Sequence, residues 1–370
     1  MGFLRPEIAQ ALSLPENVRV VIGSTSTGGD SYMIADMVTR YLGEEMGFNG
    51  KVDAIGNAQA LDTISKAKGD GTTIMMFHDM AYLSVLFGAV GEQYSLDNLT
   101  VGPRIGINPG GCFVAHADAP YNNLSEAAQW LADNPDATIT VNIESGSASH
   151  LDFVVWYMWV QEQYGDEVAS RVRALVGGTT DEKKQRLWDG NADIIYADYS
   201  SCVEFTKEGV DAQLAMKLFD TCGDLEGSGV ISMEEDGITF NGEPSCSTRT
   251  SSCSSPQDMD EGILNEITAA MQKVSENPEF QAEMANLLYS NVTAEDADLE
   301  ASRAFIQDKA ATAQEIIDVG PHPGRADLIL ALSTAPVWNR APRRGTAESG
   351  PSAGRPPIPD EREVTRCVST

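Results

Sequence analysis

Basic residues are scarce in this 370-residue chain, where 55 Asp and Glu outnumber 25 Lys and Arg. The formal net charge is −30. Such a surface repels phosphate groups, which excludes nucleic acid as a partner. The chain also has no apolar run near the roughly 20 residues that a membrane helix needs, and residues 1–15 lack the apolar core of a signal peptide. We therefore expect a soluble, multi-domain protein in a form without its export signal.

Cysteine and histidine are too few to build a metal or disulfide framework. The six cysteines form no Cys-x-x-Cys pair, and the four histidines form no HExxH motif. We expect neither a metal site nor a cofactor. Cys246 and Cys253 enclose a Ser/Thr-rich segment, and the sequence is compatible there with either a disulfide or two free thiols.

The last fifty residues differ in composition from the rest of the chain. Residues 321–370 hold eight of the 17 prolines and seven arginines, but no lysine. A stretch rich in Pro, Arg, Gly and Ser cannot bury enough apolar surface to offset the entropy of ordering it. We therefore expect residues 321–370 to form a mostly disordered tail.

Short β-branched runs alternate with helical patterns before this tail. The runs predict strands at 18–23, 51–55, 72–77, 112–115, 138–143, 172–176, 193–197 and 213–219. Helices are expected at 31–46, 151–164, 259–275, 278–289 and 295–319, the last behind an N-cap at Thr293. This alternation predicts an α/β architecture with mostly parallel sheets, and eight strands over about 320 residues predict two lobes.

Two loops rich in glycine and small hydroxyl residues join predicted strands to predicted helices. The first spans Gly23–Ser31 and the second spans Glu144–His150. In such loops backbone N–H groups approach a ligand closely, and the helix N terminus adds a partial positive charge. Two loops of this kind could hold both ends of a small anion at the carboxyl ends of the strands. The simpler interpretation is two ordinary tight turns, with His150 as a structural residue.

Two further loops occupy equivalent strand ends. Residues 176–180 contain a Gly-Gly pair, and residues 198–201 offer Tyr199 and two serine hydroxyls beside Asp198, which can also act as a helix N-cap. No GxSxG motif and no nucleophile with a nearby His and acid is evident. We therefore expect no catalytic residues and a binding protein rather than an enzyme.

The order of these motifs resembles the substrate-binding proteins of tripartite tricarboxylate transporters. The resemblance rests on the Gly-Gly loop after the first strand, the turn Lys68-Gly-Asp-Gly-Thr72, the helix start Ser147-Ala-Ser-His-Leu151, Gly177-Gly178 and the segment 189–193. It covers residues 18–320. That family has a type II periplasmic-binding-protein-like fold, in which two hinged α/β lobes close on a carboxylate.

The resemblance implies a division of the chain and a set of ligand-binding residues. Residues 1–104 form the first part of lobe I, 105–218 form lobe II, and 219–320 return to lobe I with an irregular insertion near 220–256. The ligand residues implied are Ser26, Thr27, Gly28, Gly29 and Ser31 in lobe I, and Ser145, Gly146, Ser147, Ala148, Ser149, Gly178, Asp198 and Tyr199 in lobe II.

The sequence departs from the family pattern at charged positions. Tyr32 replaces an acid, Asp36 replaces an arginine, and Glu144 replaces a glycine. An acid such as Glu144, Asp30 or Asp198 in the cleft would repel a dianion but attract an ammonium group. Small mono- or dicarboxylates are the expected ligands because the family binds them, and an amino-acid-like zwitterion is the alternative.

The function implied is capture of a small organic carboxylate outside the cytoplasm, in the periplasm, and its delivery to the subunits of a membrane permease. We expect the binding protein to be a monomer. Two other classes remain open from the sequence: an enzyme that uses the same cleft, and a ligand-sensing module.

The composition of the tail leads to a first prediction. Deleting residues 336–370 should change the melting temperature by no more than a degree or two, because a polar, Pro-rich segment buries little surface. Differential scanning calorimetry of the full chain and the truncated chain tests this. A drop of several degrees would show that the tail packs on a lobe.

Overall fold

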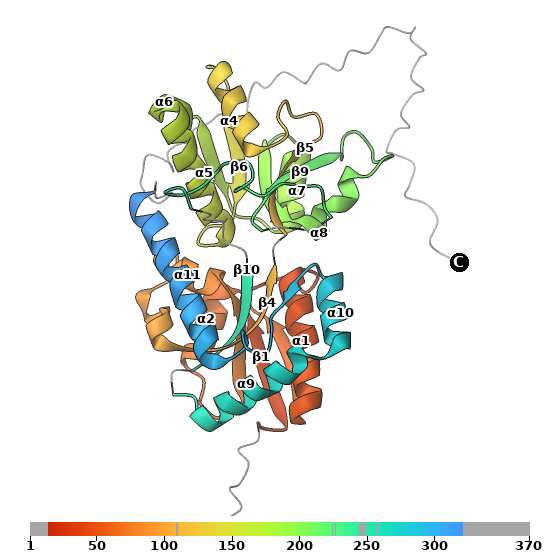
Figure 1. The fold of residues 1–370 in the computed structure, drawn as a ribbon, viewed down its shortest axis with the longest axis vertical. Helices are drawn as coiled ribbons and strands as arrows, with labels where there is room; N and C mark the ends of the chain where they lie inside the picture. The colour runs from red at the N-terminus through yellow and green to blue at the C-terminus, as the bar shows by residue number, and fades with distance from the viewer. Residues whose placement is uncertain are drawn as a thin grey trace, which may run out of the picture. The chain divides into compact units, whose positions relative to one another are not determined.

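The computed structural model describes residues 14–320 except 109, 224, 226, 244–248 and 257. All of these residues belong to one compact unit. The predicted tail at 321–370 lies outside the described residues, and so does Cys246. The described part is α/β and contains two separate sheets, each flanked by helices (Figure 1).

The first sheet has the strand order β11-β4-β10-β3-β1-β2 and defines lobe I. Its strands are β1 (Asn17–Ile22), β2 (Asn49–Ala54), β3 (Thr73–His78), β4 (Leu99–Asn108), β10 (Arg249–Pro256) and β11 (Ser290–Asn291). The second sheet has the order β7-β6-β8-β5-β9 and defines lobe II. Its strands are β5 (Gly111–His116), β6 (Ile139–Ile143), β7 (Val172–Val176), β8 (Ile194–Asp198) and β9 (Met216–Thr221).

Helices cover both faces of each sheet. Their bounds are α1 (Asp30–Met46), α2 (Asn57–Ser65), α3 (Met80–Leu86), α4 (Leu124–Asp133), α5 (Ala148–Tyr164), α6 (Asp166–Ala169), α7 (Thr180–Trp188), α8 (Tyr199–Cys202), α9 (Glu261–Ser275), α10 (Pro278–Asn286) and α11 (Leu299–Val319). Three short 3-10 helices are η1 (Glu92–Tyr94), η2 (Leu96–Asn98) and η3 (Val203–Thr206). Among the described helices, none is long and apolar enough to cross a membrane.

The alternation of side chains along the strands explains why helices cover both faces of the sheets. Val20 and Ile22 of β1 belong to the core beneath α1, α9 and α10, whereas Val21 belongs to the core that contains residues of α2 and α3. In β5, Cys112 and Val114 likewise face a small core formed with α7 and α8. Successive residues of a strand point to opposite faces, so a fully apolar strand must be covered on both sides.

The eight strands predicted from the sequence are all present, but the sheets are mixed rather than mostly parallel. The pairs β1–β2, β1–β3, β6–β7 and β6–β8 are parallel, whereas the pairs made by β4, β5, β10 and β11 are antiparallel. Of these strands, β4 and β5 adjoin the first connection between the lobes, and β10 follows the second.

Strand β10 was missed because its sequence, RTSSCSSP, is rich in small polar residues. It lies between β3 and β4, where its backbone completes the ladder. The buried Asp79 orients its start by accepting a hydrogen bond from Thr250 N at 2.6 Å. Lys309 of α11 forms an ion pair with Asp79 at 3.1 Å and donates to Thr250 Oγ1 at 3.0 Å. Polar contacts therefore fix a strand that hydrophobic patterning does not reveal.

The connections between the sheets suggest different lobe boundaries from those expected. The boundary predicted at residue 104 falls inside β4, and the one at 218 falls inside β9. We propose instead that the chain passes from lobe I to lobe II between Asn108 and Gly111, and returns between Thr221 and Arg249.

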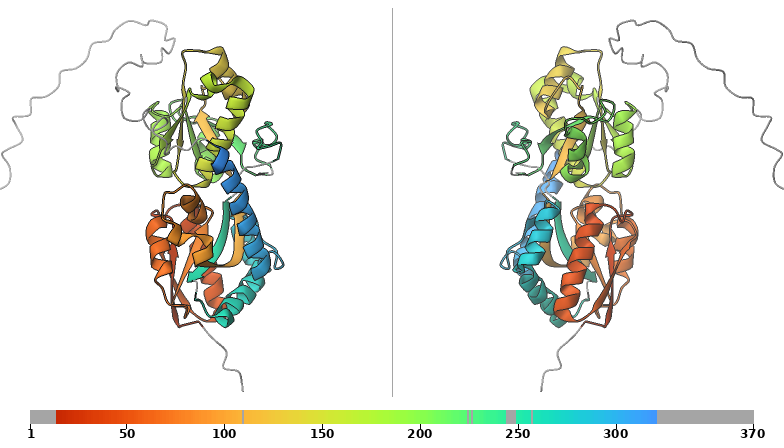
Figure 2. Two further views of the ribbon diagram at one scale, coloured as in Figure 1. Left: turned by 90° about the vertical axis from the view of Figure 1, so that its left-hand side faces the viewer. Right: turned by 90° about the vertical axis from the view of Figure 1, so that its right-hand side faces the viewer.

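Helix α11 links the two lobes. It begins at Leu299 with Asp298 as N-cap, whose carboxylate accepts from Glu300 N and Ala301 N, rather than at residue 295 behind Thr293. It packs on β4 and α3 in lobe I and on α5 in lobe II (Figures 1 and 2). Its residues Ile306 and Ile316 lie in a continuous apolar cluster that extends from α3 to the fully buried Trp156 of α5.

The structure decides between the two alternatives that the sequence left open for Cys253. Cys253 is a free thiol buried in β10, so a bridge between Cys246 and Cys253 is wrong. Burial raises the pKa of the Cys253 thiol to about 12, which keeps it protonated and unreactive at neutral pH. Cys222, at the end of β9, is disulfide-bonded. The described free cysteines are Cys112, Cys202 and Cys253.

A buried acid at the end of β9 shapes the N terminus of α4. Asp220 is fully buried and accepts a hydrogen bond from Leu124 N at 2.6 Å. Asp236 accepts from Ser125 N and Ser125 Oγ at the same helix end. Burial, together with the negative charge of Asp236, raises the pKa of Asp220 to about 9. Asp220 is therefore a neutral acid at neutral pH.

This raised pKa gives a second prediction. In the unfolded chain Asp220 loses its proton near pH 4, whereas in the folded chain it keeps the proton up to about pH 9. Its contribution to stability is therefore greatest below about pH 4 and is lost as the pH rises toward 9, by at most about 1.4 kcal/mol per pH unit. Asp220→Asn should gain stability relative to the wild type as pH rises across this range. Urea unfolding from pH 5 to 9 measures the difference.

Asp236→Asn is the matched control, because it removes the neighbouring charge and leaves Asp220 in place. It should lower the pKa of Asp220 and reduce the pH dependence only in part. A stability difference between Asp220→Asn and the wild type that does not change with pH would contradict an acid held neutral by burial.

Candidate functional site

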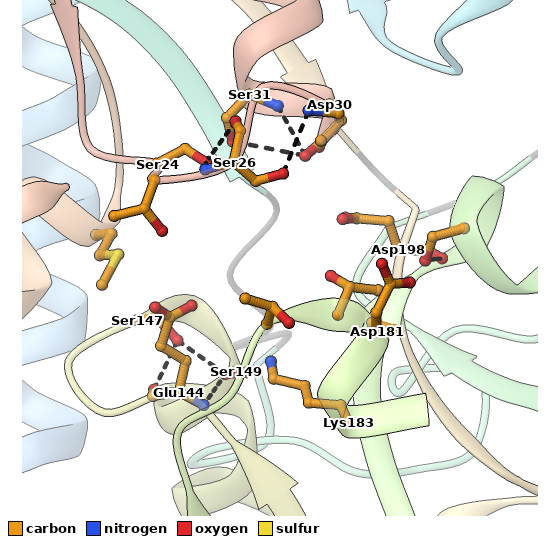
Figure 3. A pocket seen from close by; sticks show the side chains of 18 of the residues that line it. Ser24, Ser26, Asp30, Ser31, Glu144, Ser147, Ser149, Asp181, Lys183 and Asp198 are labelled. Atoms are coloured by element: carbon orange, nitrogen blue, oxygen red, sulfur yellow. Dashed lines mark hydrogen bonds between the residues drawn. The ribbon is translucent and has the colours of Figure 1, made fainter. Parts of the chain in front are cut away.

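A cavity of about 840 Å³ lies where strands of both lobes end. Its lining comes from the segments that follow β1, β2 and β3 in lobe I and from those that follow β6, β7 and β8 in lobe II. Figure 3 shows side chains from both groups around the open space. In open α/β sheets this edge is where ligands bind.

Nine of the thirteen predicted ligand residues line this cavity, and four do not. Those that line it are Ser26, Gly28, Gly29, Ser31, Ser147, Ala148, Ser149, Gly178 and Asp198. Thr27 instead lines a neighbouring hollow between α1 and α10. Ser145, Gly146 and Tyr199 belong to the same loops but are not among the lining residues.

Serine hydroxyls within the first loop, Gly23–Ser31, accept hydrogen bonds from the loop's own backbone. Ser24 Oγ accepts from Ser26 N at 3.0 Å, and Ser26 Oγ accepts from Gly28 N at 3.2 Å. Helix α1 then begins after Gly29, which has no side chain to cap it. Asp30 in the first turn accepts from Ser31 N at 2.8 Å, so one of the helix-start amides is paired with an acid. The N terminus of α1 is thus open but partly neutralised.

The helix start after the second loop, that of α5, carries more positive charge than the start of α1. Ser147 is the N-cap of α5, yet its hydroxyl donates to Glu144 O at 2.8 Å instead of accepting from the helix. Ser149 Oγ accepts from Glu144 N at 3.0 Å. No side chain caps α5, and its first turn contains no acid. The first amides of this helix adjoin the cavity with their partial positive charge uncompensated within the turn.

Gly146 lies where the second loop approaches the other lobe closely. Its φ is +69°, and a Cβ there would lie 2.9 Å from Ser84 Cα of α3. Its N–H donates to Nδ1 of His150 at 3.2 Å, and the His150 ring stacks on Phe87 with centroids 3.8 Å apart. His150 is therefore a structural residue that helps to pack lobe II against lobe I.

The third loop, at residues 176–180, caps the start of helix α7, which follows it. Thr179 and Glu182 form a reciprocal capping box, in which the Thr179 hydroxyl accepts from Glu182 N and the Glu182 carboxylate accepts from Thr179 N. Two amides at the start of α7, those of Thr179 and Glu182, are thus satisfied within the loop and the helix. Gly178 lines the cavity, with the Arg186 guanidinium directly behind it.

The sequence did not reveal the cations of the site. Lys183 and Lys184 of α7 both line the cavity. Lys183 is only 7% exposed, and its Nζ donates to Tyr196 O at 3.3 Å. Lys184 is paired with Asp181 at 2.8 Å. The only available signal was position: both lysines follow the Gly-Gly loop by one helical turn, but the spacing alone does not say which way a side chain points.

Asn108 joins acids from the two lobes at the place where the chain first crosses between them. Its Nδ2 donates to Asp30 Oδ2 at 3.0 Å and to Asp198 Oδ1 at 3.3 Å. Its Oδ1 accepts from Gly110 N at 2.8 Å, and Tyr289 OH also donates to Asp30 Oδ2, at 3.0 Å. Within the described residues no group of three or more His, Cys, Asp or Glu side chains is placed to hold a metal ion.

The sequence matches no family model and no curated protein. The structure, by contrast, is similar to solved binding proteins. MatC from Rhodopseudomonas palustris, solved with bound malate, superposes with a TM-score of 0.67 at 15% identity, over 82% of this chain and 100% of MatC. The periplasmic binding protein BugD gives 0.64 at 17% identity, over 82% and 97%. R. palustris Rpa4515, solved with adipate, gives 0.61 at 13% identity, over 81% and 98%.

This chain has the fold of a periplasmic solute-binding protein. The resemblance noted in the sequence is therefore confirmed at the level of the fold. The two-lobed α/β class is confirmed as well. In this solute-binding fold the candidate cavity lies between the two sheets, with loops from both at its wall.

The contact at Gly146 gives a third prediction. Gly146→Ala should destabilise the protein by more than the roughly 1–2 kcal/mol that a left-handed backbone costs a residue with a side chain, because its Cβ also meets Ser84. Gly190→Ala is the matched control: its φ is +71°, and a Cβ there has nothing within 4 Å. Chemical denaturation of both variants isolates the contact between lobes. Equal losses in the two variants would show that this contact contributes nothing.

Proposed function

We propose that this protein is an extracytoplasmic solute-binding protein that captures a small organic carboxylate between its lobes and delivers it to a membrane permease. Binding, rather than catalysis, is the proposed activity. The single observation that carries the proposal is the pair of 17-residue helices, α1 and α5, which start at one cavity without a side-chain cap.

Helix starts of this kind suit an anion. Each helix presents amide donors that have no intrahelical acceptor and a partial charge of about +0.5. The hydroxyls of Ser26, Ser31, Ser147 and Ser149 adjoin these amides and can hydrogen-bond a carboxylate oxygen. The proposed ligand residues are therefore the nine predicted residues that line the cavity, together with Lys183.

The net charge of −30 does not prevent an anion from binding. At physiological salt the Debye length is about 8 Å, so distant surface charges are largely screened, whereas amide donors act at contact distance. Burial of the site strengthens these short-range bonds further, because the local dielectric constant is lower than that of water.

The solved structures support the same class of function. MatC was solved with malate and Rpa4515 with adipate, and BugD is a periplasmic binding protein. We therefore propose a periplasmic or other extracytoplasmic location, a monomeric protein and a permease as its partner. The proposed lobe closure would bring the α1 and α5 loops onto opposite ends of the ligand.

Gly28 gives the fourth prediction. It lines the cavity, and the nearest atom to a Cβ built there is Ser26 Oγ at 4.0 Å, so a side chain would enter open space without disturbing the fold. In the series Gly28→Ala, Gly28→Val and Gly28→Leu, affinity for a bound carboxylate should fall stepwise as the side chain grows, while melting temperature without ligand stays nearly constant. Calorimetric titration with malate, adipate and amino acids measures the affinities.

The wild-type protein is first screened with these acids by thermal shift. A ligand present at 100 times its Kd should stabilise the fold by roughly 2.7 kcal/mol. If no carboxylate stabilises the wild type, the proposed function is wrong. If a carboxylate binds equally well to the wild type and to Gly28→Leu, the ligand lies elsewhere in the molecule.

A further inference from the structure

The wall of the cavity is rich in hydroxyl groups and poor in apolar side chains. Ten of the described residues that line it are Ser or Thr, and they lie in the segments that follow β1, β6, β7 and β8. In Figure 3, Ser26 of lobe I and Ser147 of lobe II lie on opposite sides of the open space. Among the described lining residues, the aliphatic side chains larger than alanine are those of Met33, Met80 and Leu287. The wall therefore offers a ligand many hydrogen bonds and little apolar surface.

The wall also presents little aromatic surface. No Phe or Trp is among the lining residues in the described part of the chain. The ring of Tyr196 lies edge-on to Phe113, with the ring centroids 5.2 Å apart, and only 5% of Tyr196 is exposed. Flat aromatic ligands are bound chiefly by apolar and aromatic side chains, so this wall does not favour an aromatic acid.

Two serine hydroxyls of the wall have already given their proton to the backbone. Ser24 Oγ donates to Ser26 O at 3.1 Å, and Ser201 Oγ donates to Asp198 O at 2.7 Å. A hydroxyl group has one proton and two lone pairs. In this arrangement both oxygens can therefore only accept a hydrogen bond from a ligand, and they belong to different lobes.

Asn57 adds a third acceptor. Its Nδ2 donates to Ser84 Oγ at 2.8 Å, and Ser84 Oγ in turn donates to Ala81 O at 3.0 Å. Because the Ser84 proton is used, the Asn57 amide must be the donor of this pair. Its Oδ1 therefore remains as an acceptor, beside Gly23, which also lines the cavity.

Three other hydroxyls of the wall are able both to donate and to accept. Within the described residues, the side chains of Thr25, Thr180 and Ser200 have no hydrogen-bond partner, and all three line the cavity. Thr25 lies in lobe I, whereas Thr180 and Ser200 lie at the starts of α7 and α8 in lobe II. Donors and acceptors are thus mixed on both sides of the cavity.

We propose that the ligand is a polyhydroxylated acid of the sugar-acid kind, with its carboxylate at the uncapped helix starts and its hydroxyls on the Ser, Thr and Asn groups of the wall. This inference rests on the proposed solute-binding function and narrows its ligand class. A carboxylate can only accept hydrogen bonds, so it leaves the acceptors of Ser24, Ser201 and Asn57 without a partner. A ligand hydroxyl both donates and accepts, and it can pair with every group of this wall.

An acid with a plain hydrocarbon chain fits this wall poorly. Its methylene groups would cover the hydroxyls and remove them from water without replacing their hydrogen bonds. A site that bonds the hydroxyl of its ligand discriminates strongly against an analogue without that hydroxyl for this reason. The cavity volume of about 840 Å³ also lies near the upper end of the roughly 300–1,000 Å³ that is usual for small-molecule sites, so a six-carbon acid can enter with its hydroxyls.

Matched pairs of acids test the proposal. Galactarate is compared with adipate, gluconate with hexanoate, and xylonate with pentanoate. The two acids of each pair have the same number of carbons and the same charge, and they differ only in their hydroxyl groups. Calorimetric titration of the full chain should show at least one hydroxylated acid binding tenfold or more tightly than its partner, which is about 1.4 kcal/mol. A difference below tenfold in all three pairs would overturn the proposal.

Two further titrations test the other parts of the ligand. Galactitol has the carbon chain of galactarate without a carboxylate, and it should bind tenfold or more weakly than the best hydroxylated acid. Equal binding of galactitol would refute the carboxylate, and with it both the proposed function and this inference. L-Glutamate or L-aspartate binding tenfold more tightly than every hydroxylated acid would refute the inference alone.

Variants without the free hydroxyls locate the contact in the cavity. Thr25→Val, Thr180→Val and Ser200→Ala remove these hydroxyls with little change of shape. The readout is the ratio of the affinities for the two acids of the most discriminating pair, because loss of a carboxylate contact lowers both affinities and leaves the ratio unchanged. The triple variant should reduce this ratio fivefold or more. If the triple variant does not fold, the three single variants should each reduce the ratio.

Thr312→Val is the matched control. Thr312 is exposed on α11 and does not line the cavity, and the substitution removes the same group from a helix. It should change the ratio by less than twofold. A ratio that is the same in the wild type and in the cavity variants would show that the wall hydroxyls do not recognise the ligand.

The failure of this inference and that of the proposed function are distinguishable. If adipate, hexanoate or pentanoate binds and no hydroxylated partner binds tenfold more tightly, the solute-binding function stands and only the polyhydroxylated ligand is refuted. If none of the six acids binds and no carboxylate of the thermal-shift screen stabilises the wild type, the proposed function itself fails, and this inference fails with it.

Discussion

The candidate site depends on backbone amides at two helix starts that no side chain of their own helix caps. Five of the eleven α-helices among the described residues are capped by a side chain: Asn123, Thr179, Asp260, Asn277 and Asp298 accept from amides in the first turn. At α1 the cap position is Gly29, and at α5 the hydroxyl of Ser147 is turned to Glu144 O. These two helices, the longest of the six described helices without a side-chain cap, start at one cavity. Leaving such amides without a partner costs stability, so their position at a shared cavity is consistent with a ligand that completes them.

Much of the fold could be predicted from the periodicity of apolar residues, and the positions of the cavity loops could then be predicted from the strand ends. The strands of the βα units have apolar runs because both of their faces are covered, and the amphipathic pattern of α1 matches its single buried face. Glycine and serine at strand ends then identified both cavity loops. The strand β10 could not be found in this way, because its Ser and Thr side chains carry no hydrophobic signal and its position depends on Asp79 and Lys309, far away in sequence.

The limits of prediction at the site have the same origin. Position in a loop does not determine the direction of a residue. Gly146, a predicted ligand residue, is not among the residues that line the cavity, and it closely approaches Ser84 of the other lobe. Lys183 was overlooked because a lysine on a polar helix usually faces water, and here it is buried beneath the cavity wall. The bridge from Asp30 through Asn108 to Asp198 joins residues up to 168 positions apart. Only the folded chain brings such groups together.

The apolar cluster that includes residues of α11 also links the stability of one lobe to that of the other. Ile306 and Ile316 share one buried cluster with α3 on one side and with Trp156 on the other. Unfolding either lobe alone would expose the apolar surface that the other lobe and α11 cover. The two lobes therefore share part of their apolar core through α11, although each also has a core cluster of its own. We expect the two lobes to unfold together as one cooperative unit.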